Sequence, residues 1–213
     1  MIVMSMSTIW GFGDSFTFGH GCRPDGPLPE YYNEYRKEGD GVWLDLVADR
    51  MGIKAINMGE CGISNQLILD KLIASWKRIR DEDIVVIGYT LWGRKEVPFE
   101  GRWLPLMSVV EDDGNVLGGE ILTDKERLML VQYQHRFGED TLWKKRGMAI
   151  FGFVIDRLRE RGVRVFEWSI EERASAGCQR IGHHTPYKDG HFSFLGNRQW
   201  SEVIYNRLNG VLI

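Results

Sequence analysis

The stretch Ile9-Trp-Gly-Phe-Gly-Asp-Ser-Phe-Thr-Phe-Gly19 decides how this chain is organised. An apolar run of strand type stops at glycines, and a serine follows one residue after an aspartate. Glycines beside Ser15 at a strand end predict a sharp turn that lifts the hydroxyl out of a sheet. The stretch is neither a G-x-S-x-G elbow, because residue 17 is Thr17, nor a dinucleotide fingerprint, because residue 16 is Phe16.

Downstream of this stretch, strand and helix patterns alternate. Apolar runs predict strands over 53–58, 83–89 and 163–168, and residues at helical spacing predict helices over 40–52, 64–80 and 141–161, with a last helix that starts near Ser193. The run from Asp83 to Tyr89 is continuously apolar in its middle, which is typical of a parallel strand covered on both faces. The alternation therefore predicts an α/β sheet with helices on both faces.

One segment breaks this alternation. Residues 91–122 carry an extended pattern and the turn-forming run Glu111-Asp-Asp-Gly-Asn115, and we interpret them as an insertion, a hairpin or a flap. A capping-box pattern from Thr123 then predicts a helix over 124–136. We expect residues 1–213 to form a single domain that contains this insertion.

Composition narrows the class of protein. The chain has 213 residues and a net charge of −3, which gives no electrostatic reason to expect nucleic acid or an anionic membrane as a partner. No signal peptide or membrane-spanning run is visible, and three widely spaced cysteines without a C-x-x-C motif favour a reducing compartment. We therefore expect a cytoplasmic protein, and the sequence leaves its oligomeric state open.

Polar and glycine-rich signals follow the predicted strands. They are Gly13-Asp14-Ser15, Asn57 to Gly62, Gly88-Tyr89-Thr90, and Asp189-Gly190-His191 in the last loop. Because parallel strands end at one edge of a sheet, these segments are predicted to meet there, where α/β folds place their sites.

In this order the segments resemble the sequence blocks of the GDSL/SGNH hydrolase superfamily of serine esterases and lipases. The resemblance implies a flavodoxin-like three-layer α/β/α sandwich with a mainly parallel sheet, no organic cofactor and no metal. It implies Ser15 as nucleophile, His191 as general base and Asp189 as the carboxylate that orients the imidazole. The N–H groups of Ser15 and Gly62 would receive the oxyanion.

The chain departs from this family at two places. The third block usually reads Gly-x-Asn-Asp, and its asparagine donates to the oxyanion, whereas Thr90 stands there in this chain. Thr90 could donate through its hydroxyl, or a hole with two donors could suffice. Asp189 and His191 are two residues apart rather than three, a spacing that an extended loop tolerates because residues i and i+2 project to the same side.

The expected substrate is a small acyl ester, which an O-acetylated carbohydrate would supply. Trp92 and Arg94, just beyond Thr90, are predicted substrate contacts, and the simpler interpretation is an exposed loop with an ion pair. Two other functions stay open. The chain could be a catalytically weak module that binds a glycan or a protein, or an acyltransferase that uses the same triad. A zinc site is not expected, because the spacing within one candidate cluster matches no structural-zinc pattern; that cluster is Cys178, His183, His184, Asp189 and His191.

Overall fold

The computed structural model of the chain describes residues 7–22, 41–99, 102–106, 123, 125, 128–129, 132, 140–170, 178–180 and 190–210. Its centre is a parallel sheet of five strands in the order β2-β1-β3-β6-β7. The strands are β1 (Thr8–Phe12), β2 (Lys54–Asn57), β3 (Ile84–Tyr89), β6 (Arg164–Ser169) and the short β7 (Gln179–Arg180). Counted along the sheet this is the 2-1-3-4-5 order of flavodoxin-like folds, as predicted.

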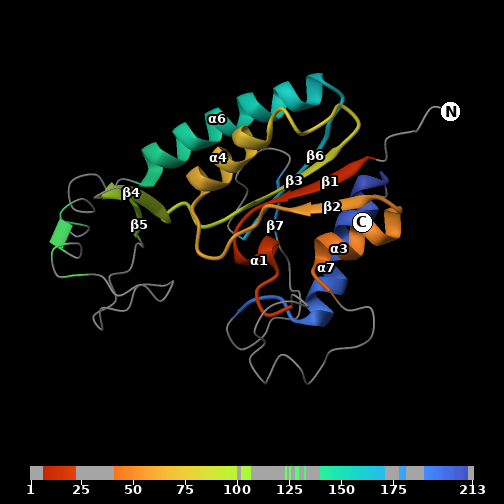
Figure 1. Cartoon of the computed structure of the whole chain (residues 1–213), viewed down its shortest axis with the longest axis horizontal. Coiled ribbons are helices and arrows are strands. Elements are labelled where there is room, and N and C mark those ends of the chain that lie inside the picture. The colour runs from red at the N-terminus through yellow and green to blue at the C-terminus, as the bar shows by residue number, and fades with distance from the viewer. Residues whose placement is uncertain are drawn as a thin grey trace.

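Two layers of helices cover the sheet (Figure 1). Helices α4 (Asn65–Ser75) and α6 (Asp140–Glu160) lie on one face, and α3 (Trp43–Met51) and α7 (Phe194–Leu208) lie on the other. Neighbouring strand residues alternate between these layers, because successive side chains of a strand point to opposite faces. Trp10 packs in the α4/α6 layer, whereas its neighbour Ile9 packs in the α3/α7 layer.

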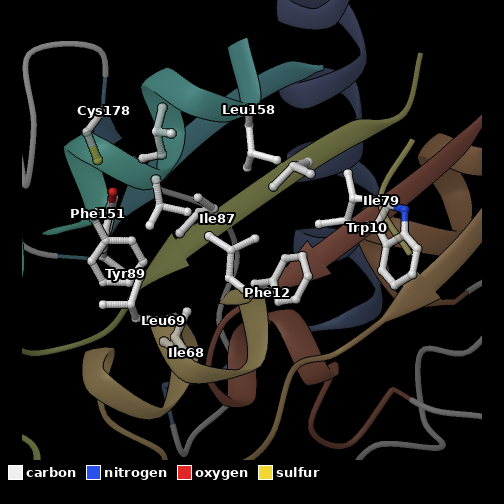
Figure 2. Close-up of a cluster of buried hydrophobic side chains, with 14 of the residues drawn as sticks. Trp10, Phe12, Ile68, Leu69, Ile79, Ile87, Tyr89, Phe151, Leu158 and Cys178 are labelled. Carbon is white, nitrogen blue, oxygen red and sulfur yellow. The ribbon is translucent and has the colours of Figure 1, made fainter. Parts of the chain in front are cut away.

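The α4/α6 layer contains the larger of the two hydrophobic clusters (Figure 2). Strand residues Phe12 and Ile87 meet Ile68 of α4 and Leu158 of α6, and all four side chains are fully buried. The predicted three-layer α/β/α sandwich is thereby confirmed, and both faces of β1 and β3 are closed to solvent.

Most predicted element boundaries agree with the structure within a few residues. The main exception is α4, which ends at Ser75, whereas the apolar spacing predicted a helix to Arg80. Residues 76–79 leave the helix in tight turns, in which the Ser75 carbonyl accepts from the backbone N–H groups of Arg78 and Ile79. Ile79 still reaches the core from this turn, so its apolar spacing misled the prediction.

Part of the predicted insertion is an antiparallel hairpin of β4 (Lys95–Phe99) and β5 (Arg102–Leu106). A hairpin was one of the two forms predicted for this segment. Residues 107–122 lie outside the described residues, and so does most of the predicted helix 124–136. Among the described residues, no helix is long and apolar enough to cross a membrane.

Asp83 joins the start of β3 to the start of β1. It is 1% exposed, and its carboxylate accepts from the backbone N–H of Thr8, the indole N–H of Trp10 and the backbone N–H of Arg80, each at 2.9 Å. A buried carboxylate is stable only when such donors surround it. One side chain therefore fixes where two central strands begin.

We expect Asp83→Ala to lower the free energy of unfolding by about 3 kcal/mol, because it leaves buried donors without an acceptor. The matched control is Asp81→Ala, two residues away, whose carboxylate is 70% exposed and pairs with Arg161. That change should cost no more than about 1 kcal/mol. Urea unfolding of both variants measures the two values, and equal losses would contradict this role of Asp83.

Candidate active site

The nucleophile predicted from the sequence lies against the predicted base. Ser15 is the first residue of α1 (Ser15–Phe18), a single helical turn that begins directly after β1. Its Oγ is 2.8 Å from Nε2 of His191, a residue 176 positions later in the chain. Ser15 is 5% exposed and His191 is half-buried. A hydroxyl at hydrogen-bonding distance from an imidazole is the arrangement that general-base activation of a serine requires.

Asp14 explains why the chain turns at this point. It is the N-cap of α1, and its Oδ1 accepts from the backbone N–H of Phe16 at 3.1 Å. Gly19 ends the turn with φ of 81°, a conformation that glycine adopts without steric cost. Asp14 and Gly19 thus confine the helix to one turn and present Ser15 at the edge of the sheet.

The loop after β2 approaches this turn backbone to backbone. Asn57 donates from Nδ2 to the carbonyl of Thr17 at 2.7 Å, and its Oδ1 accepts from the N–H of Gly59 at 2.9 Å. A Cβ at Gly59 would collide with the backbone N of Phe18. Gly62 follows with φ of 78°. Asn57 therefore holds the start of the second glycine-rich loop, at Gly59, beside the nucleophile turn.

The loop after β3 reaches the same turn through side chains. Thr90 is fully buried, and its Oγ1 is 2.7 Å from Oδ2 of Asp14. One nitrogen of the Arg94 guanidinium, NH1, donates both to Thr90 Oγ1 at 2.8 Å and to Asp14 Oδ2 at 3.1 Å. Three loops of the sheet edge therefore converge on Ser15 and its neighbour Asp14.

Comparison with solved structures agrees with this architecture. The chain is similar to a carbohydrate esterase whose active site displays divergent catalytic and non-catalytic binding functions. The TM-score is 0.52 and the identity is 14%, and the match covers 95% of this chain and 68% of the other. This likeness shows that the chain shares the fold of that esterase. A weaker likeness is to a structure assigned to the G-D-S-L family of lipolytic proteins from Desulfitobacterium hafniense DCB-2, with a TM-score of 0.37 and 12% identity over 97% of this chain and 75% of the other. Another is to AlinE4, an SGNH-hydrolase family esterase, with a TM-score of 0.29 and 13% identity over 98% of each chain. No family model and no curated protein sequence matches the chain.

Within this fold, the hydrogen bonds of Thr90 do not fit its predicted role as an oxyanion donor. A carboxylate only accepts hydrogen bonds and a guanidinium only donates them. The Thr90 hydroxyl must therefore donate its one proton to Asp14 and accept from Arg94. With that proton engaged, Thr90 is not placed as an oxyanion donor, and backbone N–H groups such as those of Ser15 and Gly62 remain as candidates.

Of the two predicted substrate contacts, Trp92 lies in the core and Arg94 lies in the site. Trp92 is 7% exposed and packs against Tyr89, Phe151 and the backbone at Gly147, so its ring belongs to the core and not to a substrate surface. Trp92 thus follows the general tendency of large aromatic side chains to fill protein cores. Arg94 does reach the site, but its observed partners are Asp14 and Thr90.

Two rings, one from the nucleophile turn and one from just after it, lie against the imidazole of His191. The Phe16 ring centroid lies 5.2 Å from that of His191, and the His20 centroid lies 4.7 Å from it. Cys61, the residue before Gly62, has its Sγ 3.5 Å from Nδ1 of His20. The imidazole of the base therefore contacts Phe16 of α1 and His20 just beyond it.

Several predicted residues lie outside the described part of the chain. These include Asp189, the proposed third member of the triad, so the described geometry is a Ser15–His191 pair. His183 and His184 of the zinc alternative are also outside it. Among the described residues, no group of three or more potential ligands could hold a metal ion.

Asn65 is a site residue that the sequence did not predict. Its Oδ1 accepts from the N–H of Thr90 and its Nδ2 donates to the carbonyl of Thr90, both at 2.9 Å. Asn65 follows Ser64, the N-cap of α4, and lies three residues after Gly62. A polar residue in the first turn of a helix beside a glycine-rich loop is the only signal in the sequence that could have indicated this role.

Close approach of backbones predicts the effect of two glycine substitutions. Gly59→Ala should lower the free energy of unfolding by about 2 kcal/mol or more, because the new methyl group meets the backbone of α1 and cannot move a side chain aside. Gly152→Ala is the control, because this glycine lies inside α6 with no heavy atom within 4 Å of the added Cβ. The control should stabilise the protein by about 0.5–1 kcal/mol. Thermal unfolding compares the two variants, and a Gly59→Ala variant as stable as the wild type would contradict the close approach.

Proposed function

We propose that the chain is a serine hydrolase that cleaves small acyl esters through an acyl-enzyme on Ser15. The 2.8 Å contact between Ser15 Oγ and His191 Nε2 carries this proposal. It joins two residues 176 positions apart, at the edge of a parallel sheet where α/β folds place their sites. The fold that the chain shares with a carbohydrate esterase supports the same reaction class.

The reaction follows from the residue types. His191 Nε2 removes the hydroxyl proton as Ser15 Oγ attacks the ester carbonyl carbon, and the carbonyl oxygen becomes an oxyanion. The N–H groups of Ser15 and Gly62 are the donors proposed to stabilise it. Collapse of the intermediate breaks the bond to the alcohol, which leaves with the proton held by His191. Water then attacks the acyl-enzyme with His191 again as base, and releases the acid and the free serine.

In this proposal Asp189 completes the triad. It lies two residues before His191, and a carboxylate at that place would fix the imidazole tautomer and stabilise the imidazolium. The substrate class is proposed from the fold relative, which is a carbohydrate esterase. An acetylated sugar is therefore the first natural substrate class to test after a model ester.

A second candidate function is a binding module with weak or no catalysis. The observation that favours it is Thr90, whose hydroxyl proton is engaged with Asp14 and therefore does not supply a third oxyanion donor. Loss of one such donor costs about 2.7–4 kcal/mol in another serine hydrolase. The active site of the similar carbohydrate esterase displays both catalytic and non-catalytic binding functions, so one site of this fold carries both.

The central test compares wild type with Ser15→Ala in hydrolysis of p-nitrophenyl acetate. We expect kcat to fall by at least about 10³-fold, because no other group replaces the nucleophile. A fluorophosphonate probe should label Ser15 of the wild type, and mass spectrometry of the peptides identifies the labelled residue.

Ser75→Ala is the matched control, since Ser75 is a buried serine of α4 outside the site, and it should retain wild-type kcat. If wild type and Ser15→Ala hydrolyse the ester at the same rate and the probe leaves Ser15 unlabelled, the hydrolase proposal is wrong. Binding of an acetylated oligosaccharide by both proteins would then favour the binding module.

A further inference from the structure

A buried charge pair lies directly beside the proposed nucleophile. The side chain of Asp14 is 2% exposed and that of Arg94 is 18% exposed, with 3.1 Å between Asp14 Oδ2 and Arg94 NH1. Thr90, fully buried, bridges the two charged groups through its hydroxyl. We refer to Asp14, Thr90 and Arg94 as the Asp14 cluster.

The polarity of the Asp14 cluster is fixed by its chemistry. Arg94 donates to Thr90 and to Asp14, and Thr90 donates to Asp14, so every bond runs toward the carboxylate. The other carboxylate oxygen, Oδ1, accepts from the N–H of Phe16 in the first turn of α1. The two oxygens of Asp14 therefore connect the nucleophile turn on one side to the loop after β3 on the other.

The loop that carries the cluster is itself held in place. Asn65 pairs with both backbone groups of Thr90, and a tight turn from Leu91 to Arg94, closed by a 3.0 Å backbone bond, returns the arginine toward Thr90. Asn65 belongs to α4, which begins just after the loop of Gly62. The Asp14 cluster thus ties the Ser15 turn to the same framework that carries the second candidate oxyanion donor.

Arg94 is held at a cost. Its Nε is buried and has no hydrogen-bond partner in the described part of the chain. Buried donors are nearly always satisfied, and an exception calls for an explanation. Here the NH1 bonds to Asp14 and Thr90 determine where the guanidinium lies, even though this leaves Nε without a partner.

We propose that Thr90 and Arg94 are positioning residues for Ser15, which act through Asp14 in place of the asparagine that usually donates at residue 90. This inference rests on the proposed hydrolase function. The cluster contributes no donor of its own to the oxyanion. It fixes the turn from which the Ser15 Oγ attacks and the Ser15 N–H points, and so maintains the geometry of a hole made of backbone donors. Removing the cluster therefore lowers the rate of acylation and leaves substrate binding unchanged.

Two matched pairs of variants test this inference. Thr90→Val removes the hydroxyl and keeps the shape of the side chain, whereas Thr90→Ser keeps the hydroxyl. Arg94→Met removes the charge, whereas the ammonium of Arg94→Lys can still donate to both oxygens. Arg157→Met is the surface control, because Arg157 is 55% exposed and pairs with Glu160 on α6. Each variant is assayed for p-nitrophenyl acetate kcat and KM and for the rate of fluorophosphonate labelling, at a temperature at which circular dichroism shows it folded.

We expect Thr90→Val and Arg94→Met to lower kcat and the labelling rate by about 10²-fold, the scale of a displaced catalytic group, with KM within about twofold of wild type. Thr90→Ser and Arg94→Lys should recover most of the rate, and Arg157→Met should equal wild type. The double variant of Thr90→Val and Arg94→Met should be no slower than the slower single variant, because both changes disrupt one unit. Recovery by the conservative variants distinguishes positioning from a general loss of stability.

Other outcomes overturn the inference. A higher KM with unchanged kcat in Arg94→Met would make Arg94 a direct substrate contact, and wild-type kcat in Thr90→Val would show that the hydroxyl positions nothing. If Arg94→Met does not fold, the Thr90 pair, in which the volume of the side chain hardly changes, decides alone. If wild type itself neither hydrolyses the ester nor reacts with the probe, the proposed function fails and this inference fails with it, an outcome that cannot be mistaken for the others.

Discussion

The packing at the carboxyl edge of the sheet leaves no room for a Cβ at three glycines, and the rest of the site depends on this constraint. A Cβ at Gly13 would collide with the Thr17 side chain, and one at Gly88 would collide with the indole of Trp168. A Cβ at Gly59 would enter the backbone of α1. A Cβ at Gly88 would also come within 2.9 Å of the Thr17 hydroxyl, so the ends of β1, β2 and β3 can pack against the turn of α1 because glycine stands at these three positions. That convergence places Ser15 within reach of a histidine from the far end of the chain.

The fold was largely predictable from the sequence, because its signals are local. The apolar run from Ile84 to Ile87 and the alternation of strands with amphipathic helices require a parallel sheet with two covering layers, and such a sheet places its loops at one edge. The Gly-Asp-Ser turn and its distant histidine followed from the same reasoning. Element ends were harder to predict where an apolar residue outside a helix still reaches the core, as Ile79 does.

The hydrogen bonds between loops could not be predicted, because they depend on which polar atoms the fold brings together. Thr90 and Arg94 both follow the third strand, and their spacing alone suggests an exposed loop with an ion pair. Only the structure shows that the acceptor is Asp14, whose other carboxylate oxygen caps its own helical turn. Trp92 was misassigned for a related reason. One residue in the middle of a functional loop turns inward to the core, and a sequence pattern this short does not reveal its direction.

Stability alone gives a poor explanation for the charge pair beside Ser15. Taking a carboxylate and a guanidinium out of water costs several kcal/mol for each ion, and replacing a buried pair with apolar side chains of similar volume often leaves a protein as stable or makes it more so. This pair also leaves the Nε of Arg94 without a partner in the described part of the chain. Apolar residues, however, would provide no directional bonds, and the helical turn of Ser15 has only four residues. A cap whose second oxygen is held by two donors from another loop fixes the direction of that turn as well as its position. In a site whose proposed oxyanion donors include the N–H of this turn, direction is what the reaction depends on.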